Sequence, residues 1–230
     1  MKKLLVAVLL MFASAAWADN LKDGYAAITT KNYPVALSKF RLAAAQGDAG
    51  AQFMIGAMFN EGLGVAQDYV EAVRWYRLAA AQGDADAQFG LGNMFRLGQG
   101  VAQDYVEAVR WYRLAAAQGH ANAQVNLGFM FDKGQGVAQD YVESVRWYRL
   151  AAAQGNADAQ HNLGVMFSDG QGVAQDFTRA HMWFNLVAVS GDKEAVKNRD
   201  NTAARMTPQQ IAQAQMMARE CTARNFKNCD

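Results

Sequence analysis

The apolar positions from Ala49 to Asn60 recur with the period of an α-helix. When successive residues are turned by about 100°, one arc collects the side chains of Ala51, Gln52, Ile55, Met58 and Phe59. Gly62 and Gly64 follow in a short loop, and glycine suits such a stop because it adopts left-handed backbone conformations without steric penalty. The pattern therefore predicts an amphipathic helix that ends at this loop.

Residues 68–82 predict a second amphipathic helix. Asp68 opens it as an N-cap, and Glu71 three residues later completes a variant of the capping box. Arg74 and Arg77 lie on the face opposite the apolar stripe, which consists of Tyr69, Ala72, Val73, Tyr76, Ala79 and Ala80. Neither helix buries its stripe alone, so this helix hairpin needs neighbouring hairpins.

The whole hairpin pattern recurs every 36 residues. An Ala-Gln pair opens each unit, and a tryptophan marks the same place in each second helix: Trp75, Trp111, Trp147 and Trp183. A fixed period of this length predicts an all-α solenoid of antiparallel helix hairpins, organised as one elongated domain with its function on the surface. The expected segments are a degenerate N-terminal hairpin at 19–48, four repeats at 49–84, 85–120, 121–156 and 157–191, and C-terminal capping helices at 192–230.

The C-terminal end of the array departs from the repeat. Residues 193–205 stand where another first helix is due, but Arg199 and Asp200 replace an apolar and a small residue. A polar replacement at this place suits a terminal cap. Thr207 as N-cap and Pro208 at the first helical position then predict a last helix.

The first 18 residues have the organisation of a secretory signal peptide. Two lysines precede an apolar run from Leu4 to Ala13, and a small-x-small site ends at Ala18. A transmembrane anchor is the alternative, but the apolar run is shorter than the ~20 residues that cross a bilayer. The sequence therefore predicts cleavage after Ala18 and an exported protein, periplasmic or secreted, with no membrane insertion afterwards.

The charge balance argues against nucleic acid or an anionic membrane as a partner. The chain has 22 basic and 21 acidic residues, and loss of the two lysines in the signal peptide changes the net charge from +1 to −1. Both kinds of partner are recruited by a basic surplus, which the chain lacks.

The segment 123–137 reads Ala-Gln-x-x-Leu-Gly-x-Met-Phe-x-x-Gly-x-Gly-Val and resembles the Sel1-like repeat, a relative of the tetratricopeptide repeat. The resemblance covers Ala49 to Gly191. It implies a right-handed superhelical stack of helix pairs that serves as an adaptor for other proteins, and bacterial members are often exported. One cysteine-rich exported subfamily is linked to β-lactam binding or hydrolysis and bridges each helix pair with cysteines eight residues apart. The corresponding positions here, such as Ala80 and Gln88, carry no cysteine.

Comparison of the four repeats with one another points to a surface. The core positions of the first helices scarcely change, whereas an arc of about 120° facing away from the core varies. We call this arc the variable stripe; it consists of Phe53, Met54, Ala57, Asn60, Phe89, Asn93, Arg96, Val125, Asn126, Phe129, Asp132, His161, Asn162, Val165 and Ser168. The second helices show no such variation, since Asp68 to Gly83 is identical to Asp104 to Gly119. The resemblance places first helices on the concave side, so we interpret the stripe as a partner groove; neutral drift is the alternative.

Other candidate sites have simpler structural explanations. The tryptophans could stack bases or sugars, but packing between helices is the better interpretation, with a cost of ~3–5 kcal/mol for truncation of one. Arg74, Arg77 and their copies could bind phosphates, but pairing with Glu71 on a solvated face is favoured. His120, His161 and His181 have no metal-ligand spacing, so neither a metal nor another cofactor is expected.

Cys221 and Cys229 are the only cysteines. In an oxidising compartment a disulfide is favoured over free thiols. Eight residues of continuous helix would separate them by ~12 Å, so the last helix must end between them, near Asn225.

Three functions remain at this stage. The leading hypothesis is a non-catalytic, monomeric adaptor that binds a protein or peptide along the variable stripe. The second is a protein that binds or hydrolyses β-lactams or cell-wall peptides, which rests on the family resemblance alone. The third is self-assembly through end-to-end stacking of near-identical repeats.

Overall fold

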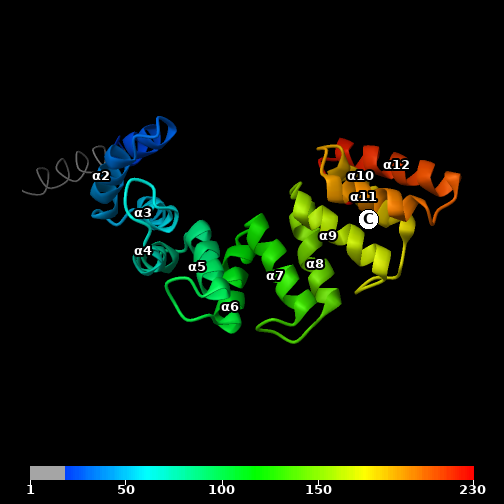
Figure 1. The fold of residues 1–230 in the computed structure, drawn as a ribbon, viewed down its shortest axis with the longest axis horizontal. Helices are drawn as coiled ribbons and strands as arrows, with labels where there is room; N and C mark the ends of the chain where they lie inside the picture. Colours follow the sequence, from blue (N-terminus) through cyan, green and yellow to red (C-terminus); the bar gives the residue numbers. More distant parts are fainter. Residues whose placement is uncertain (1–18) are drawn as a thin grey trace, which may run out of the picture. The chain divides into compact units, whose positions relative to one another are not determined.

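The computed structural model describes residues 19–230, and the expected signal peptide lies outside the described residues. Within this part of the chain every regular element is helical (Figure 1). Contacts divide the chain into two compact units, one ending at Trp111 and the other beginning at Tyr112, where the sequence suggests one continuous domain. Among residues 19–230, no helix combines the length and apolar character needed to cross a bilayer.

The described part of the first unit begins with helical residues 19–29 and ends within a second helix of the array. Its helices are α2 (Tyr33–Ala44), α3 (Ala49–Glu61), α4 (Tyr69–Ala81), α5 (Ala85–Leu97) and the first half of α6 (Tyr105–Ala117). Each helix contacts its neighbours in the sequence, α2 with α3, α3 with α4, and α4 with α5. The expected degenerate N-terminal hairpin thus corresponds to residues 19–29 and α2.

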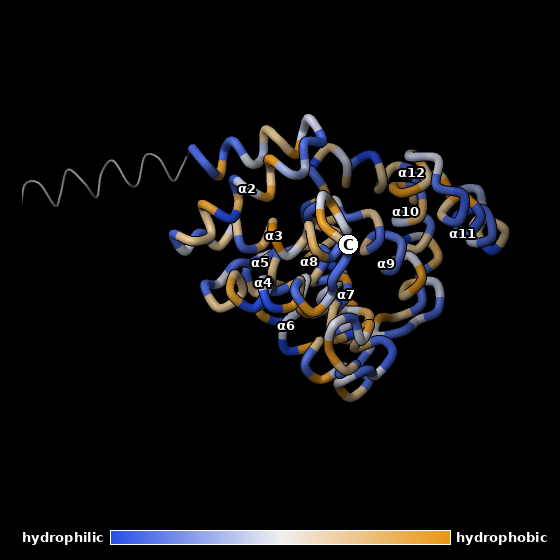
Figure 2. The backbone as a smooth tube through the Cα atoms, turned by 60° about the vertical axis from the view of Figure 1, so that its left-hand side comes forward, coloured by the Kyte–Doolittle hydropathy of each residue, from blue (hydrophilic) through white to orange (hydrophobic). Residues whose placement is uncertain are grey.

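The second unit repeats this arrangement and adds the C-terminal helices. After the second half of α6 it contains α7 (Ala121–Lys133), α8 (Tyr141–Ala152), α9 (Ala157–Asp169), α10 (Phe177–Ala188), α11 (Lys193–Ala203) and α12 (Pro208–Ala223). Helix α10 lies at the centre of the C-terminal part of this unit, because α9, α11 and α12 all contact it. Along the helices of both units hydrophobic and hydrophilic positions alternate, as Figure 2 shows.

Local capping fixes where the helices begin. At the start of α8, the Asp140 carboxylate accepts hydrogen bonds from the backbone amides of Val142 and Glu143 at 2.9 and 3.0 Å. The expected reciprocal half of the capping box is not formed, because the Asp140 amide donates to the Phe131 carbonyl and Glu143 pairs with Arg146 at 2.9 Å. In contrast, the last helix has a complete box, since Thr207 and Gln210 bond to each other's backbone amides.

Close packing inside a hairpin depends on one glycine of the first helix. A Cβ atom on Gly128 would lie 2.7 Å from the ring of Tyr148, which real contacts do not allow. The same fit recurs between Gly56 and Tyr76 and in the last repeat between Gly164 and Phe184. The Gly at this position is therefore constant because it lets an aromatic ring of the second helix lie directly on the first-helix backbone.

The constant glutamine of each first helix links adjacent hairpins. Gln124 is 4% exposed, and its amide donates to the Ala116 carbonyl at 3.2 Å. Its side-chain oxygen accepts from Gln154 at 2.8 Å. A buried amide needs such partners, so the Ala-Gln signature records a structural requirement.

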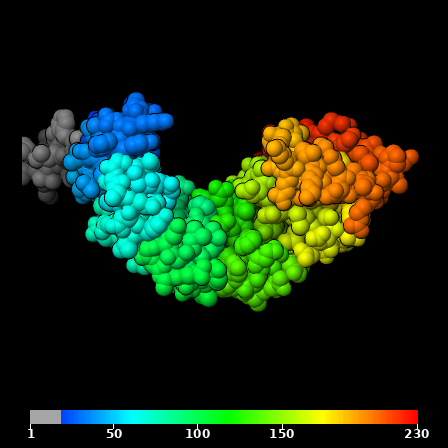
Figure 3. Space-filling model, viewed as in Figure 1, coloured from blue at the N-terminus to red at the C-terminus, as the bar shows by residue number. Residues whose placement is uncertain are grey.

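The C-terminal segment closes on the second unit through a disulfide. Helix α12 ends at Ala223, and Cys221 and Cys229 are bonded with their Cα atoms 5.0 Å apart. The side chain of Asp230 then reaches Arg149 of α8, with an N–O distance of 2.7 Å. In the space-filling view the red end of the chain lies beside the orange residues of the same unit (Figure 3).

Removal of this disulfide is expected to destabilise the C-terminal part. Closing a loop of eight residues corresponds to about 2.5 kcal/mol of unfolded-state entropy. The double variant Cys221→Ser/Cys229→Ser should therefore unfold at a lower urea concentration than the wild type, and its free energy of unfolding should be lower by an amount close to that value. A reduced wild type should behave like the variant, and equal midpoints for oxidised and reduced protein would contradict the expectation.

Candidate functional site

The variable stripe lies along the first helix of each repeat, and most of its side chains are half-buried. In the first unit the members on α3 and α5 are all partly covered by neighbouring side chains. Phe53 is the clearest example, because its ring stacks on Tyr76 with centroids 5.7 Å apart and packs against the core cluster around Leu91. Burial also raises the pKa of the Tyr76 hydroxyl. An exposed Phe53 is the expectation from the sequence; in the structure this residue is largely part of the interhelical packing.

In the second unit the stripe is more open. Phe129 on α7 is 37% exposed, and the Lys133 ammonium lies 6.0 Å from its ring centroid. The backbone carbonyl of Asp132 accepts a hydrogen bond from the Gln139 side chain at 2.7 Å, which holds the glycine loop on the helix. That bond uses only the backbone, so the side chain at this position is free to differ between repeats.

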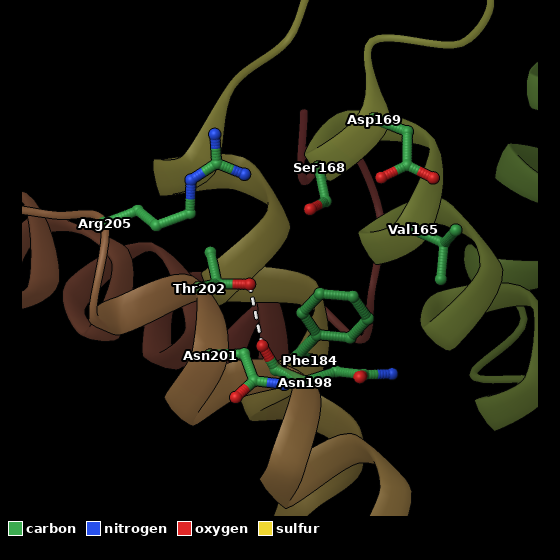
Figure 4. A pocket seen from close by; sticks show the side chains of 8 residues that line it. All are labelled: Val165, Ser168, Asp169, Phe184, Asn198, Asn201, Thr202 and Arg205. Atoms are coloured by element: carbon green, nitrogen blue, oxygen red, sulfur yellow. Dashed lines mark hydrogen bonds between the residues drawn. The ribbon is translucent and has the colours of Figure 1, made fainter.

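The α9 part of the stripe meets α11 directly. His161 Nε2 lies 3.0 Å from the Asn198 side-chain nitrogen, and the imidazole ring lies 5.5 Å from the ring of Phe184. Beside this contact a cavity of about 250 Å³ opens between α9, α10 and α11 (Figure 4). Its lining residues are Val165, Ser168, Asp169, Phe184, Asn198, Asn201, Thr202 and Arg205. We call this cavity the α9–α11 pocket.

The pocket combines an apolar floor with polar walls. Phe184 and Val165 supply the apolar surface, while Asn198 and Asn201 offer amides that both donate and accept hydrogen bonds. The Thr202 hydroxyl is already engaged, since it donates to the Asn198 carbonyl at 2.7 Å. Such a set of groups matches the donors and acceptors of a peptide main chain.

Two opposite charges stand at the pocket. Figure 4 shows the Arg205 guanidinium and the Asp169 carboxylate on either side of Ser168. The Arg205 guanidinium lies 4.1 Å from the ring centroid of Phe177, and this stacking holds it in place. A ligand carrying both a positive and a negative group is therefore complementary to the two sides of the opening.

The sequence indicates Val165 and Ser168, but it does not indicate the pocket residues that α11 contributes on the opposite side. Residues 193–205 are expected to form a polar cap, because their core positions depart from the repeat. The exposed phase of the repeat nevertheless continues, since adding 36 to Asn162, Val165 and Asp169 gives Asn198, Asn201 and Arg205. Extending the phase of the variable stripe by one more repeat would have found Asn198 and Asn201, whereas Arg205 follows the end of α11.

The second helices carry a different and constant surface. The guanidinium of Arg146 lies 4.2 Å from the ring centroid of Trp147 and pairs with Glu143, and the same trio recurs at Glu107, Arg110 and Trp111. The expected Glu–Arg pairing is present. The stacking of the arginine on the tryptophan ring is a further contact that the sequence pattern does not predict. These contacts support the interpretation of the arginines as part of a solvated helix face.

The three histidines serve separate structural roles. His120 caps α7 by accepting the Ala123 amide at 3.1 Å, and His161 contacts Asn198. His181 is buried, and burial together with the nearby Arg199 charge lowers the pKa of its imidazole. Among residues 19–230, no group of histidine, cysteine and acidic side chains has the geometry to hold a metal ion.

Comparison with protein families identifies the repeat. The Sel1 repeat family matches the chain at residues 49–84, 85–120, 121–156 and 157–188. Three of these ranges equal those expected from the sequence, and the fourth ends three residues earlier. No protein of curated function matches the chain.

Solved structures show the same architecture. A Sel1 repeat protein from Oxalobacter formigenes is 33% identical, with a TM-score of 0.69 over 89% of this chain and 77% of that one. A protective antigen from uropathogenic Escherichia coli strains, which displays an SLR fold, is 28% identical with a TM-score of 0.56 over 85% of this chain, which spans half of the antigen's length. A Sel1 repeat protein from Klebsiella pneumoniae, at 21% identity and a TM-score of 0.55 over 83% of this chain and 95% of that one, supports the fold.

Proposed function

The chain belongs to the Sel1 repeat family, and from this premise we propose that it is a non-catalytic scaffold that binds a polypeptide along the variable stripe and anchors it in the α9–α11 pocket. Sel1 repeat proteins are generally protein-interaction scaffolds, and the fold is typically non-catalytic. The observation that carries the proposal is the continuation of the stripe into α11, where Asn198 and Asn201 line a cavity together with Arg205, which follows the helix.

The chemistry of the pocket supports a polypeptide over an apolar small molecule. Two asparagine amides, two hydroxyls and a charge of each sign surround only two apolar side chains. A peptide main chain satisfies amide groups in pairs, whereas an apolar ligand would leave them without partners at a cost in binding free energy. The partner is therefore expected to place a short stretch of main chain, with charged side chains on both sides, between α9 and α11.

Export belongs to the same proposal. The disulfide between Cys221 and Cys229 supports it, because such bonds persist in oxidising compartments. The amino-terminal pattern that predicts a signal peptide supports it as well. The scaffold would then act in the periplasm or outside the cell.

The proposal predicts that the pocket dominates affinity. The double variant Asn201→Ala/Arg205→Glu should weaken partner binding by at least about tenfold, since a few central polar and arginine contacts commonly account for most of the binding free energy. A photo-crosslinking residue at position 165 would identify the partner in the exporting cell, and titration of that partner would then measure the affinity. Circular dichroism checks that the helices are intact.

A matched variant separates this site from the constant surface. Arg110→Glu makes the same charge change as Arg205→Glu, but on an exposed second helix. It should leave the affinity of the partner within about twofold of the wild type. Equal losses for both variants, or an unchanged affinity after the pocket substitutions, would refute the pocket as the anchoring point.

A further inference from the structure

The C-terminal segment of this chain occupies a groove on the second helices of its own second unit. A crevice of about 440 Å³ is lined by Arg149 and Leu150 of α8, Ala153 at the C-cap of that helix and Trp183 of α10. From the C-terminal segment, Phe226, Asn228, Cys229 and Asp230 complete the lining. We call the first four of these side chains, with Gly155, the occupied groove. It lies on the constant surface and is separate from the variable stripe.

Two contacts fasten the segment. The ring of Phe226 fills the space beside Gly155, where a Cβ atom would lie 3.2 Å from two ring carbons. Four residues later, the Asp230 carboxylate accepts a hydrogen bond from Arg149 Nε at 2.7 Å, and that carboxylate is only 10% exposed. The groove therefore binds an aromatic side chain at its glycine and a carboxylate at its arginine.

The repeat supplies the same five residue types three more times. Because the second helices are nearly identical, the equivalents of the occupied groove follow at intervals of 36 residues. We call them the vacant grooves. Two lie in the first unit and consist of Arg41, Leu42, Ala45, Gly47 and Trp75, and of Arg77, Leu78, Ala81, Gly83 and Trp111. The third lies in the second unit and consists of Arg113, Leu114, Ala117, Gly119 and Trp147.

The vacant grooves lack the cover that the tail provides. At Gly47, Gly83 and Gly119 a Cβ atom would meet no heavy atom within 4 Å among the described residues, in contrast to Gly155. Ala117 and Gly119 are exposed, whereas Ala153 and Gly155 are half-buried. The leucine does not distinguish the grooves, because Leu114 and Leu150 are both 43% exposed, so the difference lies at the alanine and the glycine.

The arginine of the vacant groove in the second unit is already in position. Arg113 lies 5.8 Å from the ring centroid of Phe131, just as Arg149 lies 5.9 Å from that of Phe167. Within the described chain Arg149 has Asp230 as its ion-pair partner, and Arg113 presents the same group on an exposed residue. A guanidinium that is already positioned by stacking favours an acidic ligand, because little rotamer entropy is lost on binding.

We propose that the vacant grooves bind a partner polypeptide that presents an aromatic side chain followed, four residues later, by a carboxylate, in the manner of residues 226–230. A foreign segment is the expected occupant, because the Cys221–Cys229 disulfide tethers each copy's own tail to its own α12. Near-identical grooves would give a partner with several such segments multivalent attachment, which increases avidity without new contacts.

The probe for this proposal is a disulfide-closed synthetic peptide of residues 220–230 carrying a fluorophore at its amino end. Fluorescence anisotropy with the full wild-type chain should show saturable binding at more than one site per chain. Peptides with Phe226→Ala or Asp230→Asn should bind at least about tenfold more weakly, because each removes one of the two fastening contacts.

Two protein variants with equal charge locate the binding. Arg41→Ala/Arg77→Ala/Arg113→Ala removes the arginines of the vacant grooves and should weaken binding by at least about tenfold. Arg74→Ala/Arg110→Ala/Arg146→Ala removes three arginines that pair with glutamates, and it should leave binding within about threefold of the wild type. Helicity by circular dichroism confirms that both proteins are folded.

Several outcomes would overturn the proposal. They are the absence of saturable binding, equal effects of the two triple variants, and binding that appears only after residues 224–230 are deleted, since that would restrict recognition to the occupied groove. Self-association of the wild type that the peptide disperses would assign the grooves to a second copy of this chain. None of these results bears on the α9–α11 pocket, whose variants are tested with a different ligand.

Discussion

Gly172→Ala is expected to destabilise the second unit by about 4 kcal/mol or more, an effect seen only when backbone geometry or a core is broken. Gly172 has φ +69°, a region that a side chain makes costly. In addition, a Cβ atom there would lie 2.2 Å from the Tyr141 carbonyl oxygen and 2.9 Å from the Val142 amide nitrogen. Because both obstacles are backbone atoms of α8, no rotamer change relieves the clash.

Gly191→Ala is the matched control for this prediction. Gly191 has φ +83°, but a Cβ atom there would meet nothing within 4 Å. Its cost should be only the conformational one, about 1–2 kcal/mol. Urea unfolding followed by circular dichroism compares the two variants, and equal midpoints would show that the loop shifts away from α8 without penalty. Gly100→Ala, whose Cβ atom would lie 2.2 Å from the Tyr69 carbonyl oxygen, extends the test to the first unit.

Trp183→Ala should cost about 3–5 kcal/mol, the range for truncation of a fully buried aromatic side chain. Trp183 is 2% exposed and belongs to the core cluster that also contains Phe184 and Cys221. It lines the occupied groove as well, so its loss also removes a surface on which the C-terminal segment lies. Both effects lower the free energy of unfolding.

Trp147→Ala offers a comparison at the equivalent place of the preceding repeat. Trp147 is half-buried, and the Arg146 guanidinium covers one face of its ring. Folding removes less apolar surface of Trp147 than of Trp183 from water, so truncation of Trp147 should cost about half as much free energy of unfolding. Urea denaturation midpoints of the two variants test this prediction. A larger decrease of the midpoint for Trp147→Ala than for Trp183→Ala would mean that burial of the ring does not set the cost.

These predictions refine the interpretation of the repeated glycines. The sequence identifies both glycines of the loop as elements that end a helix. The structure gives them different tasks, because Gly170 ends α9 in a left-handed conformation while Gly172 lies against the preceding second helix. Only the second task depends on another repeat, and a pattern along one hairpin does not reveal it.

The candidate site divides in a similar way. Variation among repeats indicated Val165 and Ser168, because exposed positions of one helix are readable from a period of 3.6 residues. The opposite side of the pocket, with Asn198 and Asn201 of α11, was not predicted, because the polar core positions of this helix indicated that the array had ended. In the first unit the same rule overestimated the exposure of the stripe, because the ring of Phe53 lies against Tyr76 although an exposed ring was expected.

The sequence by itself determined the 36-residue period, the helices of each hairpin, most of their capping residues and the family. These features depend on interactions within a few residues along the chain, which local periodicity and capping chemistry record. Tertiary structure alone decided which stripe residues are covered, where the α9–α11 pocket opens and which tryptophan is fully buried. It also decided that Asp230 pairs with Arg149, 81 residues away. Such contacts join segments whose proximity follows from packing, and no local pattern encodes them.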